Sequence, residues 1–517
     1  MRQDGNEGIW RIPELDRQSL VRPAVEDWPK IALGNRKLNE ARSLHRQIVA
    51  GAIAFTEQVL GEKIKLPSER DPMVLVTGHQ PRFYHPGVWF KNFLLAEVAA
   101  QSGAIAINLI VDTDEAGVLE AAVPLFADGW QQEKIPLLTA EANKTFEFLA
   151  PPTSEQITKF ISSLRELGTE GYQEQSKANV QRFLALLSED DGGTDLDRSL
   201  RLAEWLTKLR RLYEGEQARY LEYPVSLLAE TSEFKGFMAE LINDAAFFTK
   251  QYNQTLAAYR RAHGYRYRVN PFPDLIRDEA NADYELPLWL MKDGVRAPAY
   301  VKTAQGHCSL HAAGEAVLSW SGKLVAEQLE GVALRPRGMT LTLFMRLFGC
   351  DLFLHGVGGA KYDGATSQFI RDYYQVEPPE YAGATLTVYP HLNVHEVSSE
   401  ELSELEELIR DVEYNPDRHL KEAGLSDLEQ EELQDMVRRK ELLITQIKAG
   451  DANRKEIGLE IKKLNRSIGS AVSVYQQELT RRLAEKKEMF AASKEAKRRD
   501  YAYFLFDPGE IAQFAKQ

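Results

Sequence analysis

Cysteine is scarce in this chain, which has only Cys308 and Cys350 among its 517 residues. Two cysteines cannot build a disulfide framework, and so few are typical of a protein that folds in a reducing compartment. Apolar runs long enough to cross a bilayer are also missing, and the N-terminal residues lack the hydrophobic stretch of a signal peptide. We therefore expect a cytoplasmic protein with no membrane partner.

A surplus of basic residues is missing as well. The chain has 63 Lys and Arg residues against 77 Asp and Glu residues, which gives a formal net charge of −14. Because nucleic-acid binding needs a basic surface for the phosphate backbone, we expect no nucleic-acid partner. With 44% hydrophobic and 27% charged residues the composition is that of a globular protein, and the length favours several domains.

The pattern of apolar runs and breaks divides the chain into five predicted segments. They are an N-terminal helical segment (1–72), the first half of a core (73–130), an insertion (131–329), the second half of the core (330–397) and a C-terminal helical domain (398–517).

The clearest local pattern is a strand, a helix and a second strand at the start of the core. The apolar run Met73–Thr77 predicts a buried strand, residues 88–101 a helix that ends at Gly103, and residues 104–111 a second strand. Strands joined by one helix run parallel, so this unit predicts an α/β fold with a parallel sheet. Because a strand at Asp351–His355 repeats the pattern, we predict a discontinuous Rossmann-like core with a mostly helical insertion.

Heptad spacing predicts a helical hairpin near the C-terminus. Ser426 and Glu429 form a capping box, and the apolar residues that follow recur at a/d spacing, with Lys440 as the exception. After a Gly/Asp turn, a second heptad run extends from Ile457 to Tyr475. We predict an antiparallel coiled coil and expect a homodimer formed through it.

Two loops that leave predicted strand ends, at 78–87 and 356–364, are the candidate ligand site. In open α/β sheets such loops face the ligand crevice, where helix N-termini favour anions. We predict that His79 and His85 bind phosphate oxygens and that Lys361 offsets the charge of a departing pyrophosphate. The alternative for each is structural: a hydrogen-bonded loop histidine or a solvated lysine.

Asp112 and Asp114 end the second predicted strand at the same edge. Each could hold a ribose hydroxyl, a metal ion or a substrate amine, or could instead cap a helix. The loop GVGGAK lacks the spacing of a P-loop, and the nucleophile motif G-x-S-x-G is absent.

A metal site is the rival interpretation of two other histidine clusters. His307, Cys308 and His311 lie close together, as do His391 and His395, and zinc takes such ligands. Residues four apart in a strand are about 13 Å apart, however, and these stretches look strand-like or irregular. We therefore predict no metal site.

The order and spacing of several weak motifs resemble those of the bacillithiol biosynthesis cysteine-adding enzyme family (BshC), which is similar in its core to HIGH-type nucleotidyltransferases. The motifs are VTGHQPRFYHPGVWFKN, NLIVDTDEAGVLE, SEFKGFMAELI, AHGYRYRVNPFPDL, LRPRGMT and HGVGGAKYDGATSQFI, together with the terminal hairpin. The resemblance covers nearly the whole chain. The turn Gly78-His79-Gln80 departs from the family pattern. A second form of this interpretation is therefore a diverged relative that acts on a different acid and a different amine.

The resemblance implies a ligase that adds cysteine, or another amine, to a carboxylate such as that of glucosaminyl-malate, with activation by ATP and Mg²⁺. It implies catalytic roles for His79, His85, Asp114 and Lys361. The nucleotide-binding residues that it implies are Gly78, Gln80, Lys91, Asp112, Arg335, Gly358, Gly359 and Asp363. The alternatives are a nucleotide-binding coiled-coil scaffold without catalysis and a metal-dependent hydrolase.

Overall fold

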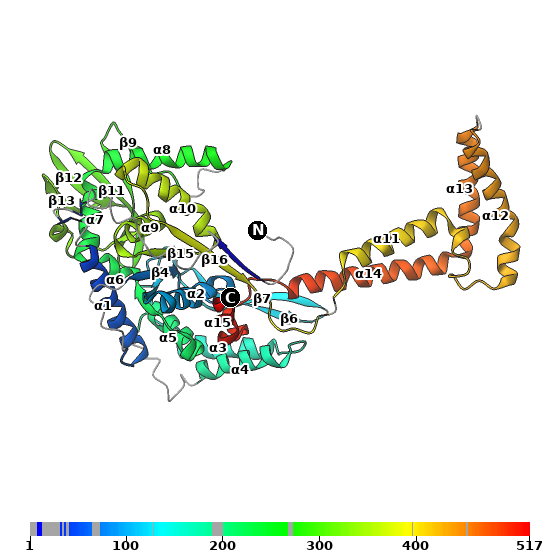
Figure 1. Ribbon diagram of the computed structural model, residues 1–517, viewed down its shortest axis with the longest axis horizontal. Coiled ribbons are helices and arrows are strands. Elements are labelled where there is room, and N and C mark those ends of the chain that lie inside the picture. Colours follow the sequence, from blue (N-terminus) through cyan, green and yellow to red (C-terminus); the bar gives the residue numbers. More distant parts are fainter. Residues whose placement is uncertain are drawn as a thin grey trace. The chain divides into compact units, whose positions relative to one another are not determined.

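The computed structural model describes residues 8–12, 32–33, 36–37, 41–64, 73–127, 129–188, 200–266, 272–394, 396–450 and 453–517. The chain forms two compact units, whose elements are labelled in Figure 1. Unit 1 comprises Met1–Val123, Glu133–His391 and Arg499–Gln517, and unit 2 comprises Pro124–Gln132 and Leu392–Arg498. Among the helices of the described ranges, none is long and apolar enough to cross a membrane.

A six-stranded sheet organises unit 1. Five parallel strands lie in the order β16 (Tyr381–Thr387), β15 (Leu352–His355), β4 (Val74–His79), β5 (Ile105–Ile110) and β8 (Leu221–Pro224), and β1 (Gly8–Ile12) pairs antiparallel with β16. The first parallel strand of the chain, β4, is therefore central, and later strands are added on both sides of it. The mixed α/β class and the parallel sheet predicted from the sequence are confirmed.

The predicted strand–helix–strand unit is present as β4, α2 (Pro86–Ser102) and β5. Pro86 occupies the first helical position, where its missing N–H is not needed. Gly103 ends the helix at φ +68°, a left-handed conformation that favours glycine. These local signals explain why the unit could be predicted to within a few residues.

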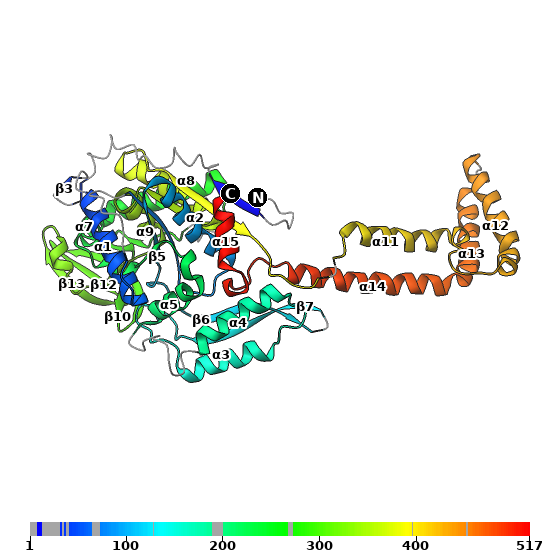
Figure 2. The same ribbon diagram turned by 60° about the horizontal axis from the view of Figure 1, so that its bottom comes forward.

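The range 131–329, predicted as a mostly helical insertion, differs from that expectation. It does contain α3 (Ser154–Glu166), α4 (Glu174–Ser188), α5 (Leu202–Glu214), α6 (Val225–Ala229), α7 (Ser232–Asn243) and α8 (Ala245–His263). However, the same range also contributes β8, which pairs with β5 in the parallel sheet. The range is therefore not an insertion separate from the sheet. Helices α3 and α4 pack side by side (Figure 2).

A second, antiparallel sheet follows α8. Its strands lie in the order β13 (Glu315–Ser321), β12 (His307–Ala312), β11 (Val295–Ala304), β10 (Asp283–Lys292) and β14 (Leu334–Pro336), with β9 (Arg277–Asp278) beside β10. Each of three hairpins turns on two residues with positive φ, of which the second is a glycine: Gly294, Gly306 and Gly314. Such turns match the twist of paired strands, so the meander is encoded locally.

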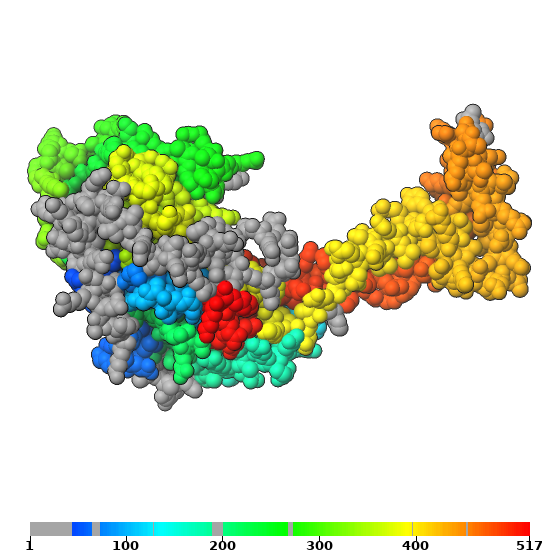
Figure 3. All heavy atoms as spheres, in the orientation of Figure 1, coloured from blue at the N-terminus to red at the C-terminus, as the bar shows by residue number. Residues whose placement is uncertain are grey.

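Alternation along the parallel strands divides the core into two layers. Val74, Val76 and Ile107 join the large cluster formed with α1 (Ala41–Leu60), α7, α8, α9 (Gly338–Phe344) and α10 (Val357–Phe369). On the other face Asn108 and Glu222 meet α5, and α2 packs beside α15 (Pro508–Lys516), drawn in red in Figure 3. A two-stranded sheet of β6 (Val118–Phe126) and β7 (Trp130–Thr139) was not predicted.

Unit 2 is built mainly from α11 (Ser399–Tyr414), α12 (Asp427–Lys448), α13 (Arg454–Ala471) and α14 (Ser473–Ala496). Helices α12 and α13 pack against each other, as the predicted hairpin requires, and α11 packs against α14. Lys440, the exception in the heptad pattern, is buried and forms an ion pair with Asp417. Ala471, which lies within the second predicted heptad run, is exposed.

Candidate functional site

The carboxyl ends of β4 and β15 lie side by side where strand order reverses. From β4 the chain adds β5 and β8 on one side, and later β15 and β16 on the other side. Helices that follow the two adjacent strands diverge at such a point and leave a crevice, which is where open α/β sheets bind ligands. Both loops predicted as the ligand site start at this point.

Lys91 of α2 is a buried lysine at this point, and no acidic side chain among the described residues forms an ion pair with it. Lys91 is only 3% exposed, and its Nζ donates to the carbonyl oxygen of Gly78 at 3.0 Å. A Cβ placed on Gly356 would lie 3.9 Å from Lys91 Cδ, so the lysine reaches across to the loop after β15. Burial lowers the pKa of Lys91 to about 8, which leaves it mostly charged at neutral pH.

Helix α10 begins at the same edge with an uncapped first turn. Gly356 is its N-cap and offers no side chain to the helix, and Gly358 and Gly359 are exposed. The first N–H groups of a helix have no partner within the helix, and the helix dipole favours negative charge there. Lys91 and the start of α10 therefore supply a buried cation and backbone donors from the two sides of the strand-order reversal.

Helix α2, in contrast, has its N-terminus closed by protein atoms. His85 caps it, because its Nδ1 accepts from Gly87 N at 3.0 Å. A Cβ on Gly87 would lie 2.4 Å from Thr385 Oγ1, and Arg499 donates to the same hydroxyl. The helix after β4 therefore cannot cradle a phosphate at its first turn, and the phosphate role predicted for His85 reduces to one Nε2–H donor.

His79 has the opposite tautomer. Its Nδ1 donates to Gln80 O at 3.1 Å, which leaves Nε2 as an acceptor. Burial, and next the charge of Lys91, lower the pKa of His79 to about 3, so the ring is neutral at physiological pH. A neutral ring with this tautomer cannot donate to phosphate, so its expected phosphate contact does not fit, whereas a hydroxyl or amine donor does.

Asp114 and Gln80 hold the loop rather than face an open site. Gln80 Nε2 donates to Asp114 Oδ2 at 2.7 Å, and Arg296 from the antiparallel sheet forms an ion pair with the other carboxylate oxygen. Burial acts to raise the pKa of Asp114, but the hydrogen bond from Gln80 and the charge of Arg296 outweigh it and lower the pKa. Arg296 was missed by sequence reasoning because no motif links it to residue 114.

Asp112 belongs to a buried polar cluster beyond β5 and β8. It accepts from the N–H and the hydroxyl of Ser226, in the first turn of α6, and burial raises its pKa to about 6. Arg335 lies nearby and donates to Glu147 at 3.0 Å and to Glu230 at 2.7 Å. The acidic partners of Arg335 carry no sequence signal, and they occupy the guanidinium that was predicted to bind nucleotide.

Asp363 and Lys361 are separated by the geometry of α10. Asp363 is buried and accepts from Arg346 and His355 at 2.9 Å each, so it ties the helix to the core and does not line the crevice. The Lys361 side chain is exposed, while its carbonyl oxygen accepts from Tyr259. Gly359 packs on the ring of His355, where a Cβ would come within 2.8 Å of Nδ1.

The rival metal clusters have other partners. His307 contacts the hydroxyl of Ser321 at 2.8 Å, and His311 contacts Asp283 at 2.9 Å. In the described part of the chain, no group of three or more His, Cys, Asp or Glu residues could hold a metal ion. His391 lies 3.4 Å from Glu510, and His395 lies outside the described residues.

Comparison with known proteins found no family model that matches the chain and no matching curated protein.

Proposed function

We propose that the protein is an ATP-dependent ligase that joins cysteine or a similar amine to a carboxylate, with the triphosphate held where strand order reverses. The observation that carries the proposal is Lys91, a buried cation that donates its hydrogen bond to a neutral carbonyl oxygen. A buried charge is costly unless it is paired, so a site of this kind favours an anionic ligand.

Three further features support a nucleotide as that ligand. The order of the parallel strands is the one found in Rossmann-like sheets, which bind nucleotides at this reversal. The uncapped start of α10 offers backbone N–H groups to phosphate oxygens, and His85 retains an Nε2–H donor. The family resemblance of the motifs in both loops points to the same chemistry.

The residues of the chain would bind and orient the reactants. Lys91 and the first turn of α10 would hold the phosphates, and the Nε2 of His79 would accept a hydrogen bond from the attacking amine or from a ribose hydroxyl. ATP, when bound, supplies the activation that turns the carboxylate into an acyl group with a good leaving group. The amine nitrogen then forms the amide bond and gives up one proton, while that leaving group departs with the bonding electrons and takes up the proton.

Binding can be tested by thermal unfolding of wild type, Lys91→Met and Lys361→Met with ATP, ADP, AMP or pyrophosphate. A ligand held at a hundredfold excess over Kd adds about 2.7 kcal/mol to the stability of the folded state. We expect ATP to raise the melting temperature of wild type and of Lys361→Met, but not of Lys91→Met. An equal shift in Lys91→Met would place the nucleotide elsewhere.

Catalysis requires a separate assay. Wild type is incubated with ATP, cysteine and glucosaminyl-malate, and the amide product is sought by mass spectrometry, with Lys91→Met as the matched control. Product from wild type alone supports the ligase; ATP binding without turnover of any amine and carboxylate tested leaves a nucleotide-binding protein.

We also propose that α12 and α13 form a coiled coil that pairs two subunits, which sedimentation of wild type and Ile461→Asp would test.

A further inference from the structure

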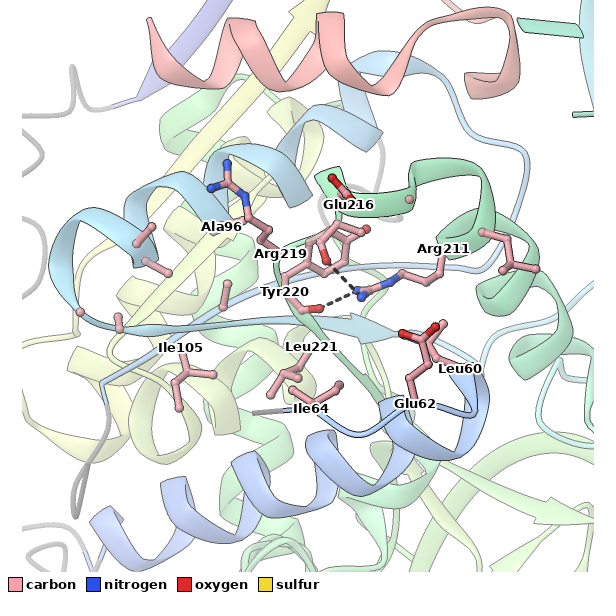
Figure 4. A pocket seen from close by; sticks show the side chains of 18 residues that line it. Leu60, Glu62, Ile64, Ala96, Ile105, Arg211, Glu216, Arg219, Tyr220 and Leu221 are labelled. Atoms are coloured by element: carbon pink, nitrogen blue, oxygen red, sulfur yellow. Dashed lines mark hydrogen bonds between the residues drawn. The ribbon is translucent and has the colours of Figure 1, made fainter. Parts of the chain in front are cut away.

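A cavity of about 860 Å³ lies at the opposite edge of the parallel sheet (Figure 4). It is lined by the C-terminal ends of α1, α2 and α5 and by Ile105 and Leu221, which start β5 and β8. Leu60, Ile64 and Ala99 give it apolar walls. Its volume is within the range of small-molecule sites, and it uses no residue of the proposed nucleotide site.

The two arginines of the lining already have partners. Arg211 Nη1 donates to Tyr220 O at 2.5 Å and its Nη2 donates to Ala218 O at 3.1 Å, as the dashed lines in Figure 4 show. Arg219 lies 3.8 Å from Glu97. Arg211 also lies 3.6 Å from the carboxylate of Glu222, so both guanidinium groups have an acidic partner and neither is an uncompensated positive charge that would attract an anion.

The carboxylates of the lining are different. Glu62 follows α1 and Glu216 lies in the short turn after α5, and both are exposed. Within the described ranges neither has a basic side chain in an ion pair. Three helices also end at the cavity, and the last carbonyl groups of a helix, together with its dipole, favour positive charge. The two carboxylates and the three helix ends therefore all favour a positively charged ligand in the cavity.

We propose that this cavity binds a small organic cation, namely a primary amine carried on an apolar body. The ammonium group would lie between Glu62 and Glu216 near the helix ends, and the apolar body would cover Leu60, Ile105 and Leu221. Since β5 has six residues with a rise of about 3.3 Å each, the cavity is roughly 20 Å from the crevice where strand order reverses. The amine therefore binds without displacing a nucleotide.

Tryptamine and indole-3-acetate are suitable probes, because they share an apolar ring and differ in the sign of their charge. Isothermal titration of the full chain should show tryptamine binding at least tenfold more tightly than indole-3-acetate. Ala100→Trp, at an exposed position of the lining, should abolish tryptamine binding by filling the cavity. The double variant Glu62→Gln/Glu216→Gln should weaken it tenfold or more, and Glu166→Gln, an exposed glutamate of α3, should leave it unchanged.

Absence of tryptamine binding to wild type, or equal affinity for indole-3-acetate, would overturn the proposal. Unchanged affinity in Ala100→Trp would also overturn it, provided that the variant melts as wild type does. If Ala100→Trp fails to fold, the double glutamine variant tests the proposal instead, because both substitutions are conservative and both positions are exposed. Unchanged tryptamine affinity in that variant would then overturn the proposal. Binding of ATP should be the same in all of these variants, so failure here is distinct from failure of the nucleotide site.

Discussion

Replacing Lys91 by methionine should stabilise the ligand-free protein while removing nucleotide binding. Burial lowers the pKa of Lys91 from 10.5 to about 8, and one pKa unit corresponds to about 1.36 kcal/mol, so the buried ammonium costs the folded state about 3 kcal/mol. Methionine is apolar and similar in length, so it fits the space beside Gly356 that the aliphatic part of the lysine side chain occupies. It loses the hydrogen bond to the carbonyl oxygen of Gly78, which contributes about 1 kcal/mol.

The pH dependence gives the sign of the effect. A lysine whose folded pKa is lowered destabilises the folded state below about pH 8, and this penalty disappears as the pH rises toward 10.5, the value in the unfolded chain. Wild type should therefore gain stability, relative to Lys91→Met, between about pH 8 and 10.5. Urea unfolding of both proteins at pH 7, 8.5 and 10 measures this difference.

Nucleotide binding should reverse the pKa shift. An anion beside Lys91 favours its charged form, so binding near pH 8.5 should be accompanied by proton uptake by wild type and by none in Lys91→Met. Titration calorimetry in buffers of different ionisation enthalpy detects this proton. A Lys91→Met protein that is less stable than wild type at pH 7 and still binds ATP would refute the reasoning.

Other predictions test the surroundings of the site and unit 2. Gly359→Ala should destabilise by about 1–3 kcal/mol because its Cβ would overlap the histidine ring at the end of β15, whereas Gly358→Ala, with open space, should be neutral or stabilising; urea unfolding compares them. In unit 2, Asp417→Asn should cost about 3–5 kcal/mol by leaving Lys440 buried and charged, while the double variant Asp417→Asn/Lys440→Met, which removes both charges, should cost much less, as thermal melts would show. Burial raises the pKa of Glu147 from 4.5 to about 7, so its protonated form stabilises the fold at low pH; this contribution is lost as the pH rises through 7, and Glu147→Gln should flatten that part of the stability profile.

Local patterns made the centre of the fold predictable. The strand β4, helix α2 and strand β5 follow one another with a proline at the helix start and a glycine at its end, and each signal acts within a few residues. Strand β8 has four residues between two helices, too few to show alternation, and its place in the sheet depends on pairing with Ile107–Ile110. Such long-range pairing has no counterpart in the local sequence.

The candidate site shows the same division between location and role. The two loops were found because strand ends and glycines mark them, but the role of each histidine depends on which ring nitrogen the fold engages. His85 accepts from a backbone N–H, and His79 donates to a backbone carbonyl. The acids that neutralise Arg335 and the arginine that neutralises Asp114 come from distant segments, so the charge remaining at the site could not be worked out from the motifs.

The direction of the parallel strands gives the two edges of the sheet opposite electrostatic character. Helices after β4 and β15 begin at the carboxyl edge, where α10 presents N–H groups and Lys91 adds a buried positive charge. Helices α1, α2 and α5 end at the other edge, where Glu62 and Glu216 add negative charge. An anion at the first edge and a cation at the second are thus both favoured by the same chain direction, and side-chain charge reinforces the helix dipoles at each. The net charge of −14 does not reveal this separation of charge, because the net charge sums over the whole chain and the separation depends on the residues at each edge.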